Sequence, residues 1–217
     1  MDMEKARYHM IEQQIRPWNV LDQRLLDAMA TIPREEFVPN DQRQRAFMDI
    51  AIPLGDGELM MHPKLEGRLL QALNLKPDDS VLEVGTGSGF VTALLSSLAA
   101  TVTTVEINPS VSQAATEKLT SHGITNVTFK VGDGAQGWPL EAPFDAILLT
   151  GSLLSINPSL RNQLAVDGRL VAVVGTSPAM EAILLERKSG DNYIETSLFD
   201  TELPSLENIQ IPPEFTF

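Results

Sequence analysis

Three glycines at alternate positions follow an apolar run in residues 81–90, VLEVGTGSGF. Glycine adopts backbone conformations that other residues avoid, so Gly85, Gly87 and Gly89 predict a tight turn between a strand and a helix. Ligands of open parallel sheets bind beyond the carboxyl ends of the strands, which makes this turn the expected cofactor site. A turn without a ligand is the alternative, and the entropic cost of three glycines argues against it.

The spacing of the glycines and an acid beside them indicate which ligand the turn holds. The pattern is G-x-G-x-G, one residue shorter than a dinucleotide fingerprint, and Glu83 lies two positions before it. A carboxylate there disfavours a pyrophosphate and favours a cation, so NAD is the weaker candidate. S-adenosylmethionine carries an ammonium and a sulfonium group, and we expect the turn to hold its amino-acid end. The expected contacts are Glu83, Gly85, Thr86, Gly87 and Gly89.

Two further acids follow the next two predicted strands. Glu106 ends the second strand, where a carboxylate accepts hydrogen bonds from ribose hydroxyls. Asp133 lies in a GDG turn after the third strand and is placed to accept from an adenine amino group, with Gly134 leaving room for the ring. A solvated strand-end acid and a turn aspartate that bonds its own backbone are the respective alternatives. Three acids at the ends of three consecutive strands indicate a cofactor site more strongly together than any one of them does alone.

Composition excludes several classes of function. The chain has 217 residues with 16 basic and 29 acidic side chains, a net charge of −13, which disfavours nucleic acids and anionic membranes as partners. It has no cysteine, so disulfides, thiolate nucleophiles and cysteine-bound metals are excluded, and we expect no metal site. The sequence shows neither a signal peptide nor a membrane-spanning apolar run, and a cytoplasmic location is the expectation.

Alternating strand and helix patterns from Ser80 onward must position these residues. Apolar strands joined by helices are typical of a mostly parallel sheet covered on both faces, an α/β fold. The last two segments, 179–188 and 192–200, predict an antiparallel hairpin around Gly190. The expected strands are 80–85, 101–107, 126–133, 144–151 and 168–175, and the expected helices are 90–100, 109–123 and 159–166.

The first 75 residues predict a helical extension of this sheet domain. A helix that ends at Pro17, a second at 21–31 and a third at 63–73 flank a Pro- and Gly-rich loop at 37–63. We expect residues 1–75 to form part of a substrate site and residues 76–217 to form the cofactor-binding domain.

Six blocks of the chain resemble the protein-L-isoaspartate O-methyltransferase family. They are residues 32–39, 46–55, 81–90, 131–138, 142–150 and 160–175. The resemblance implies a class I methyltransferase fold, Rossmann-like, with S-adenosyl-L-methionine as the cofactor. It implies that the acceptor is the α-carboxylate of an isoaspartyl residue in a damaged protein. It also implies that the cofactor contacts include Glu83, Gly85, Gly87, Glu106, Asp133 and Gly134.

One stretch departs from the family pattern. The family typically has Thr-Ile-Ser where this chain has Leu59, Met60 and Met61, and a thioether donates no hydrogen bond. A carboxylate acceptor is already ionised near neutral pH, so transfer to it requires no base. Met61 and His62 are the candidate catalytic residues, with His62 as a base or a carboxylate contact. A solvated loop histidine is the alternative for His62.

Two other functions remain open at this point. One is a methyltransferase that uses the same cofactor with a different acceptor, such as a small molecule. The other is a protein that binds S-adenosylmethionine without catalysis. The sequence leaves the oligomeric state open.

Overall fold

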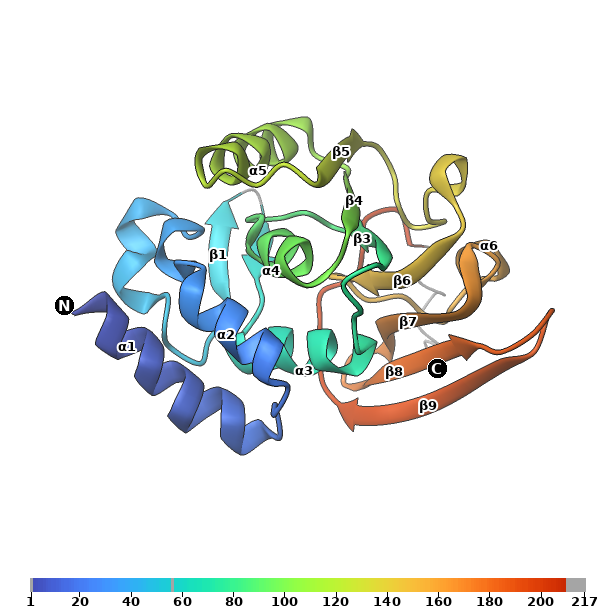
Figure 1. Ribbon diagram of the computed structural model, residues 1–217, viewed down its shortest axis with the longest axis horizontal. Helices are drawn as coiled ribbons and strands as arrows, with labels where there is room; N and C mark the ends of the chain where they lie inside the picture. The colour runs from blue at the N-terminus through green and yellow to red at the C-terminus, as the bar shows by residue number, and fades with distance from the viewer. Residues whose placement is uncertain (1, 56, 210–217) are drawn as a thin grey trace, which may run out of the picture.

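A seven-stranded sheet forms the centre of the computed structural model, which describes residues 2–55 and 57–209 (Figure 1). The strand order is β5-β4-β3-β6-β7-β8-β9, and β3 to β7 run parallel while β8 and β9 are antiparallel. The chain moves outward in one direction from β3 to β5 and in the other from β6, so the order reverses beside β3. The bounds are β3 Ser80–Val84, β4 Thr101–Glu106, β5 Val127–Val131, β6 Phe144–Leu149, β7 Leu164–Thr176, β8 Ala179–Arg187 and β9 Tyr193–Asp200.

Helices cover one face of the sheet and shorter segments cover the other. The first face packs against α3 (Pro63–Leu73) and α4 (Phe90–Leu98), while α5 (Pro109–Ser121) contacts β4 and β5. Leu82, Ile147 and Leu170 point to the opposite face, where side chains of the loops and of α6 (Pro158–Arg161) bury them. The expected α/β class is therefore confirmed, with helices of very unequal length on the two faces.

Local sequence signals place several element boundaries correctly. Pro63 is the first residue of α3 and Pro109 the first residue of α5, where a missing backbone N–H costs nothing. The Asn108 side chain caps α5 by accepting from the backbone N–H groups of Ser110 and Val111. The hairpin of β8 and β9 also forms as expected around Gly190.

The expected helix at residues 159–166 is wrong beyond its first turn. Helix α6 ends at Arg161, and Leu164 already belongs to β7, where it pairs with Phe144 of β6. Leu160 and Leu164 are four residues apart and both fully buried, which imitates the period of a helix. Backbone pairing with β6 overrides that pattern.

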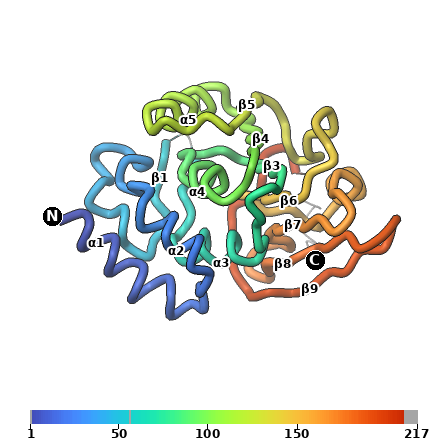
Figure 2. The backbone as a smooth tube through the Cα atoms, in the orientation of Figure 1, coloured from blue at the N-terminus to red at the C-terminus, as the bar shows by residue number. Residues whose placement is uncertain are grey.

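The N-terminal segment packs as a helical layer beside the sheet (Figures 1 and 2). Helix α1 (Met3–Met10) continues into a π turn and a 3-10 turn that end at Trp18, and α2 (Gln23–Thr31) follows. Two 3-10 turns and a small hairpin of β1 (Ile52–Gly55) and β2 (Glu58–Met60) then lead to α3. Figure 2 shows α1 and α2 at the opposite side of the molecule from the β8–β9 hairpin. No helix among the described residues is both long and apolar enough to span a bilayer.

A buried arginine ties this layer together. Arg34 has no exposed surface, and its guanidinium lies 4.8 Å from the centre of the Phe90 ring. It donates to the backbone oxygens of Ala46 (2.9 Å) and Met61 (2.8 Å) and to the carboxyl group of Glu66 on α3. The Arg34 side chain therefore connects the loops of Ala46 and Met61 to α3 and to the aromatic ring at the start of α4.

Candidate active site

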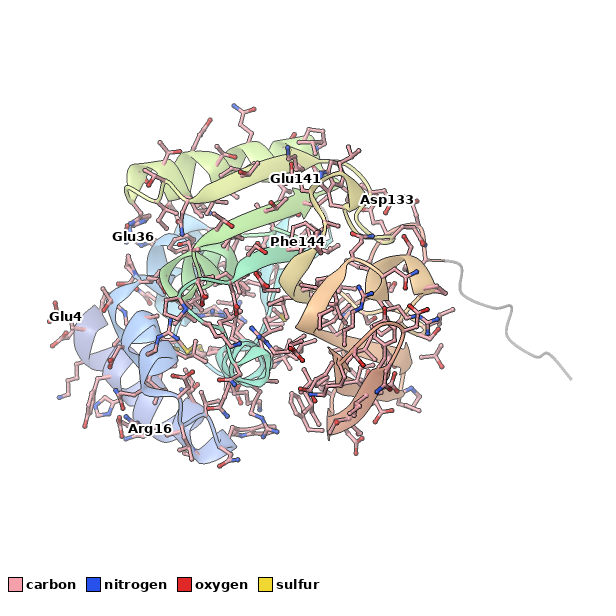
Figure 3. The ribbon with its side chains drawn as sticks, turned by 45° about the vertical axis from the view of Figure 1, so that its right-hand side comes forward. Glu4, Arg16, Glu36, Asp133, Glu141 and Phe144 are labelled. Carbon is pink, nitrogen blue, oxygen red and sulfur yellow. The ribbon has the colours of Figure 1, made fainter. Side chains whose placement is uncertain are left out.

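A cleft of about 330 Å³ opens at the carboxyl ends of the central parallel strands, where the strand order reverses. Its sheet side consists of the loops that follow β3, β4, β5 and β6, and Figure 3 labels Asp133 on the loop after β5. Its other walls come from the N-terminal layer and from the segment after β9. The lining includes 84–88, 105–107, 132–135 and 150–151, then 57–61, Glu66, Val91 and 203–207.

The glycine turn presents its backbone to this cleft. Gly85, Thr86 and Gly87 line it, and Gly85 has a φ of +94° that disfavours any other residue. A Cβ on Gly85 would clash with the hydroxyl of Thr150, which donates to the Gly85 carbonyl at 2.6 Å. Gly89 lies elsewhere, at the start of α4, where a Cβ would come within 2.5 Å of Leu119. Gly89 therefore lets α4 approach α5 and is not part of the cleft wall.

Replacement of Gly85 by alanine is expected to lower the affinity for the cofactor at least tenfold, because the turn must shift to admit the side chain. The matched control is Gly190→Ala, since Gly190 also has a positive φ, of +55°, but an added Cβ meets nothing within 4 Å. Titration calorimetry with S-adenosyl-L-homocysteine measures the affinity. Equal affinities for the two variants would contradict this role of the turn.

Glu106 is held firmly at the centre of the cleft. Its side chain is 4% exposed and lines the cleft. One carboxylate oxygen accepts from the Gly87 N–H and the other from the Asn108 N–H, both at 3.0 Å. Each oxygen keeps a free lone pair, so the group is placed to accept from a ligand hydroxyl as well.

Asp133 and Gly134 lie at the far end of the same wall. Asp133 accepts from its own turn, at the Ala135 N–H (2.9 Å), and from the Asn208 side chain (3.1 Å). Asp133 therefore does bond to its own turn, as the alternative from the sequence has it, and it also lines the cleft. A Cβ on Gly134 would come within 2.7 Å of Val84, so this glycine lets the loop pack on β3.

The position of Glu83 corrects the electrostatic argument made from the sequence. Glu83 is fully buried, lies outside the residues that line the cleft, and accepts from the hydroxyls of Thr92 and Thr104 at 2.6 Å. Burial raises its pKa to about 8, although the two hydrogen bonds act in the opposite direction. At neutral pH the side chain is mostly protonated, so its charge does not face a ligand. Glu83 instead connects the end of β3 to α4 through Thr92 and to β4 through Thr104.

Other acids supply the negative charge that the sequence argument assigned to Glu83. Every charged side chain among the described lining residues is acidic. The pKa of Glu58 is raised, by burial first and then by the charges of Glu106 and Glu207. Such a cleft favours a cation and disfavours a pyrophosphate. The acids that supply this charge are Glu58, Glu106, Asp133 and Glu207, whereas the fifth acid, Glu66, is paired with Arg34.

The structure separates the two expected catalytic residues. Met61 is buried and lines the cleft beside Met60. His62 does not reach the cleft, because successive side chains of an extended segment point in opposite directions. The His62 ring is 40% exposed, and its Nδ1 lies 3.5 Å from a carboxylate oxygen of Asp49. It lines a separate cavity with Trp18, so the structure does not bring His62 into the cleft beside Met61.

Comparison with known proteins gives a consistent family. Residues 5–201 match the family model described as protein-L-isoaspartate(D-aspartate) O-methyltransferase (PCMT). The chain belongs to this family. It is 40% identical over 206 residues to the protein-L-isoaspartate O-methyltransferase of Roseiflexus sp. (strain RS-1), a match that covers 95% of this chain and 94% of that protein. The enzyme of the same name from Roseiflexus castenholzii is 42% identical with the same coverage.

Solved structures agree with the fold. A protein-L-isoaspartate O-methyltransferase structure superposes with a TM-score of 0.78 at 24% identity, covering 94% of this chain and 65% of that longer one. A second, from Plasmodium falciparum and bound to S-adenosyl-L-homocysteine, is described as a protein-L-isoaspartate O-methyltransferase of the PCMT type. It has a TM-score of 0.79 at 18% identity, covering 95% and 99% of the two chains. At these identities the likeness concerns the fold, which is that of a class I methyltransferase.

In this member of the PCMT family, two parts of the cleft wall were missed by sequence reasoning. Glu66 was one, although it is the single acid on the apolar face of α3, between Leu65 and Leu69, and that position was a usable signal. The segment 203–207 was the other. It follows β9 and joins the sheet side through Ser152, which donates to the Pro204 oxygen at 2.8 Å. Nothing in its sequence indicates this placement.

Proposed function

We propose that this chain is an S-adenosyl-L-methionine-dependent methyltransferase that methylates the α-carboxylate of isoaspartyl residues in damaged proteins. The observation that carries the proposal is the identity of about 40%, over nearly the whole length of both chains, to proteins named for this activity. The acidic cleft supports it, because it suits a sulfonium cofactor. A group of three or more side chains able to bind a metal ion is absent from the described residues.

We propose one orientation of the cofactor in the cleft. We place its amino-acid end at the turn of Gly85, Thr86 and Gly87, its ribose at Glu106 and its adenine beside Asp133. The exposed glycine backbone and the two strand-end acids support this assignment. We propose that the acceptor would bind beside the wall that contains Met61.

The reaction needs alignment more than acid or base chemistry. When bound, S-adenosyl-L-methionine supplies a methyl group on a sulfonium, and an ionised carboxylate oxygen takes it as the carbon–sulfur bond breaks. The role of the protein is to align the reacting atoms and exclude water. Met60, Met61 and Val91 supply an apolar wall for this purpose. We propose that the segment 1–75 contributes the Met60 and Met61 part of that wall to the substrate site and that residues 76–217 hold the cofactor.

The direct test is transfer of labelled methyl from S-adenosyl-L-methionine to an isoaspartyl peptide. We expect label in the isoaspartyl peptide, as an ester that base releases, and none in the peptide with a normal aspartyl residue. Calorimetry with S-adenosyl-L-homocysteine on the same sample shows whether the cofactor site is intact. Cofactor binding without transfer to the isoaspartyl peptide would rule out the proposed acceptor and leave another acceptor or a non-catalytic role.

A further inference from the structure

Among the described residues of the cleft wall that carries Met61, one buried side-chain oxygen has no hydrogen-bond partner. Glu66 is 1% exposed and lines the cleft with Met60 and Met61. Its Oε2 accepts from Arg34, whereas its Oε1 has no hydrogen-bond partner among the described residues. A buried carboxyl oxygen without a partner is costly, and in native proteins such an atom usually has a bound partner that completes it.

A methyl-accepting carboxylate at this wall needs a hydrogen-bond donor. The thioethers of Met60 and Met61 donate nothing, and no cation lies among the described lining residues. Two nearby hydroxyls are already used. Thr86 shares a hydrogen bond of 2.6 Å with Thr104, and Thr150 donates to the Gly85 carbonyl. Among the buried and described side chains of the cleft lining, Glu66 is therefore the one with a polar atom that has no partner.

We propose that Glu66 binds the acceptor: its free Oε1 carries a proton and donates a hydrogen bond to the isoaspartyl carboxylate. The inference rests on the proposed function, because it takes that carboxylate as the ligand. A carboxyl group and a carboxylate that share one proton form a strong hydrogen bond. The second oxygen of the substrate forms the new bond to the methyl carbon as the carbon–sulfur bond breaks. The proton stays on Glu66.

The charges around Glu66 are compatible with a neutral carboxyl group. Burial raises its pKa, and this effect exceeds the opposing charge and hydrogen bond of Arg34. The other charged groups that line the cleft are the acids Glu58, Glu106, Asp133 and Glu207, and negative charges in the same cleft favour retention of the proton. On α3 itself, Arg68 faces a different cavity. Binding of the substrate carboxylate adds a further negative charge and holds the proton more firmly.

The test compares Glu66→Gln with Glu66→Leu, using the isoaspartyl peptide and S-adenosyl-L-homocysteine. Glutamine keeps an acceptor for Arg34 and an N–H donor for the substrate, whereas leucine removes both. We expect Glu66→Leu to raise the KM for the peptide about ten- to a hundredfold, the value of one charge-assisted hydrogen bond, with cofactor affinity within about twofold. Glu66→Gln should retain a KM close to wild type. The wild-type KM should rise with pH as Glu66 ionises, and the Glu66→Gln KM should not.

Glu35→Leu is the matched control. Glu35 is also buried (5% exposed) and bound to an arginine, Arg7, and its Oε2 also lacks a partner, but it lies outside the cleft lining. Equal peptide KM values for Glu66→Leu and Glu35→Leu would overturn the inference and leave the proposed function intact. If Glu66→Leu does not fold, the pH comparison decides, and an unchanged pH dependence in Glu66→Gln overturns it. A wild type that methylates neither peptide refutes the proposed function, and the inference with it.

Discussion

Arg34→Met is expected to lower the free energy of unfolding by about 3–5 kcal/mol. The substitution removes three hydrogen bonds from a charged donor and leaves the carbonyls of Ala46 and Met61 and the carboxyl of Glu66 without it. These groups are buried around Arg34, so water replaces the lost hydrogen bonds poorly. Urea unfolding followed by circular dichroism measures the loss.

Arg16→Met provides the comparison for this prediction. Arg16 bonds Glu12 one helical turn away at 2.8 Å, but both side chains are more than a third exposed. Such surface pairs contribute at most about 1 kcal/mol, so this variant should unfold close to wild type. If Arg34→Met lost no more stability than Arg16→Met, the described network around Arg34 would not be a stabilising one.

Glu83→Gln is expected to remove much of the pH dependence of stability between pH 4.5 and about 8. The folded protein raises the pKa of Glu83 from an ordinary 4.5 to about 8, so it keeps a proton that the unfolded chain releases. The resulting stabilisation is fully present below pH 4.5 and is lost as the pH rises through 8. The difference between these limits is at most roughly 5 kcal/mol.

Urea unfolding at a series of pH values checks this prediction. The wild type should lose stability steadily toward pH 8, and Glu83→Gln should lose distinctly less, because its amide does not titrate. Glu66 also has a raised pKa, so a residual slope is expected in the variant. The same slope in both proteins would show that Glu83 is ionised in the fold.

Local chemistry made much of the fold predictable from the sequence. Pro63 and Pro109 fix helix starts, and Gly190 fixes the hairpin, because each acts through its own backbone. The strand ends were predictable for the same reason, since parallel strands bring Glu106 and Asp133 to one edge of the sheet. These positions depend on the order of elements more than on tertiary detail.

The parts that sequence reasoning missed depend on packing between distant segments. Which face of β3 carries Glu83 follows from the position of α4, and a position in the sequence does not reveal it. Leu164 belongs to a strand because β6 lies beside it. Glu66 and the segment 203–207 enter the cleft through contacts with Arg34 and Ser152, far away along the chain.

The all-acidic lining of the cleft has a consequence for turnover. Methyl transfer removes the positive charge from the sulfur. S-adenosyl-L-homocysteine therefore lacks a Coulomb attraction to the acids that S-adenosyl-L-methionine possesses. We therefore expect Glu58, Glu106 and Glu207 to bind S-adenosyl-L-methionine more tightly than S-adenosyl-L-homocysteine, the product that has lost the methyl group. This difference in affinity limits inhibition of the enzyme by its product S-adenosyl-L-homocysteine, and added salt should reduce the difference.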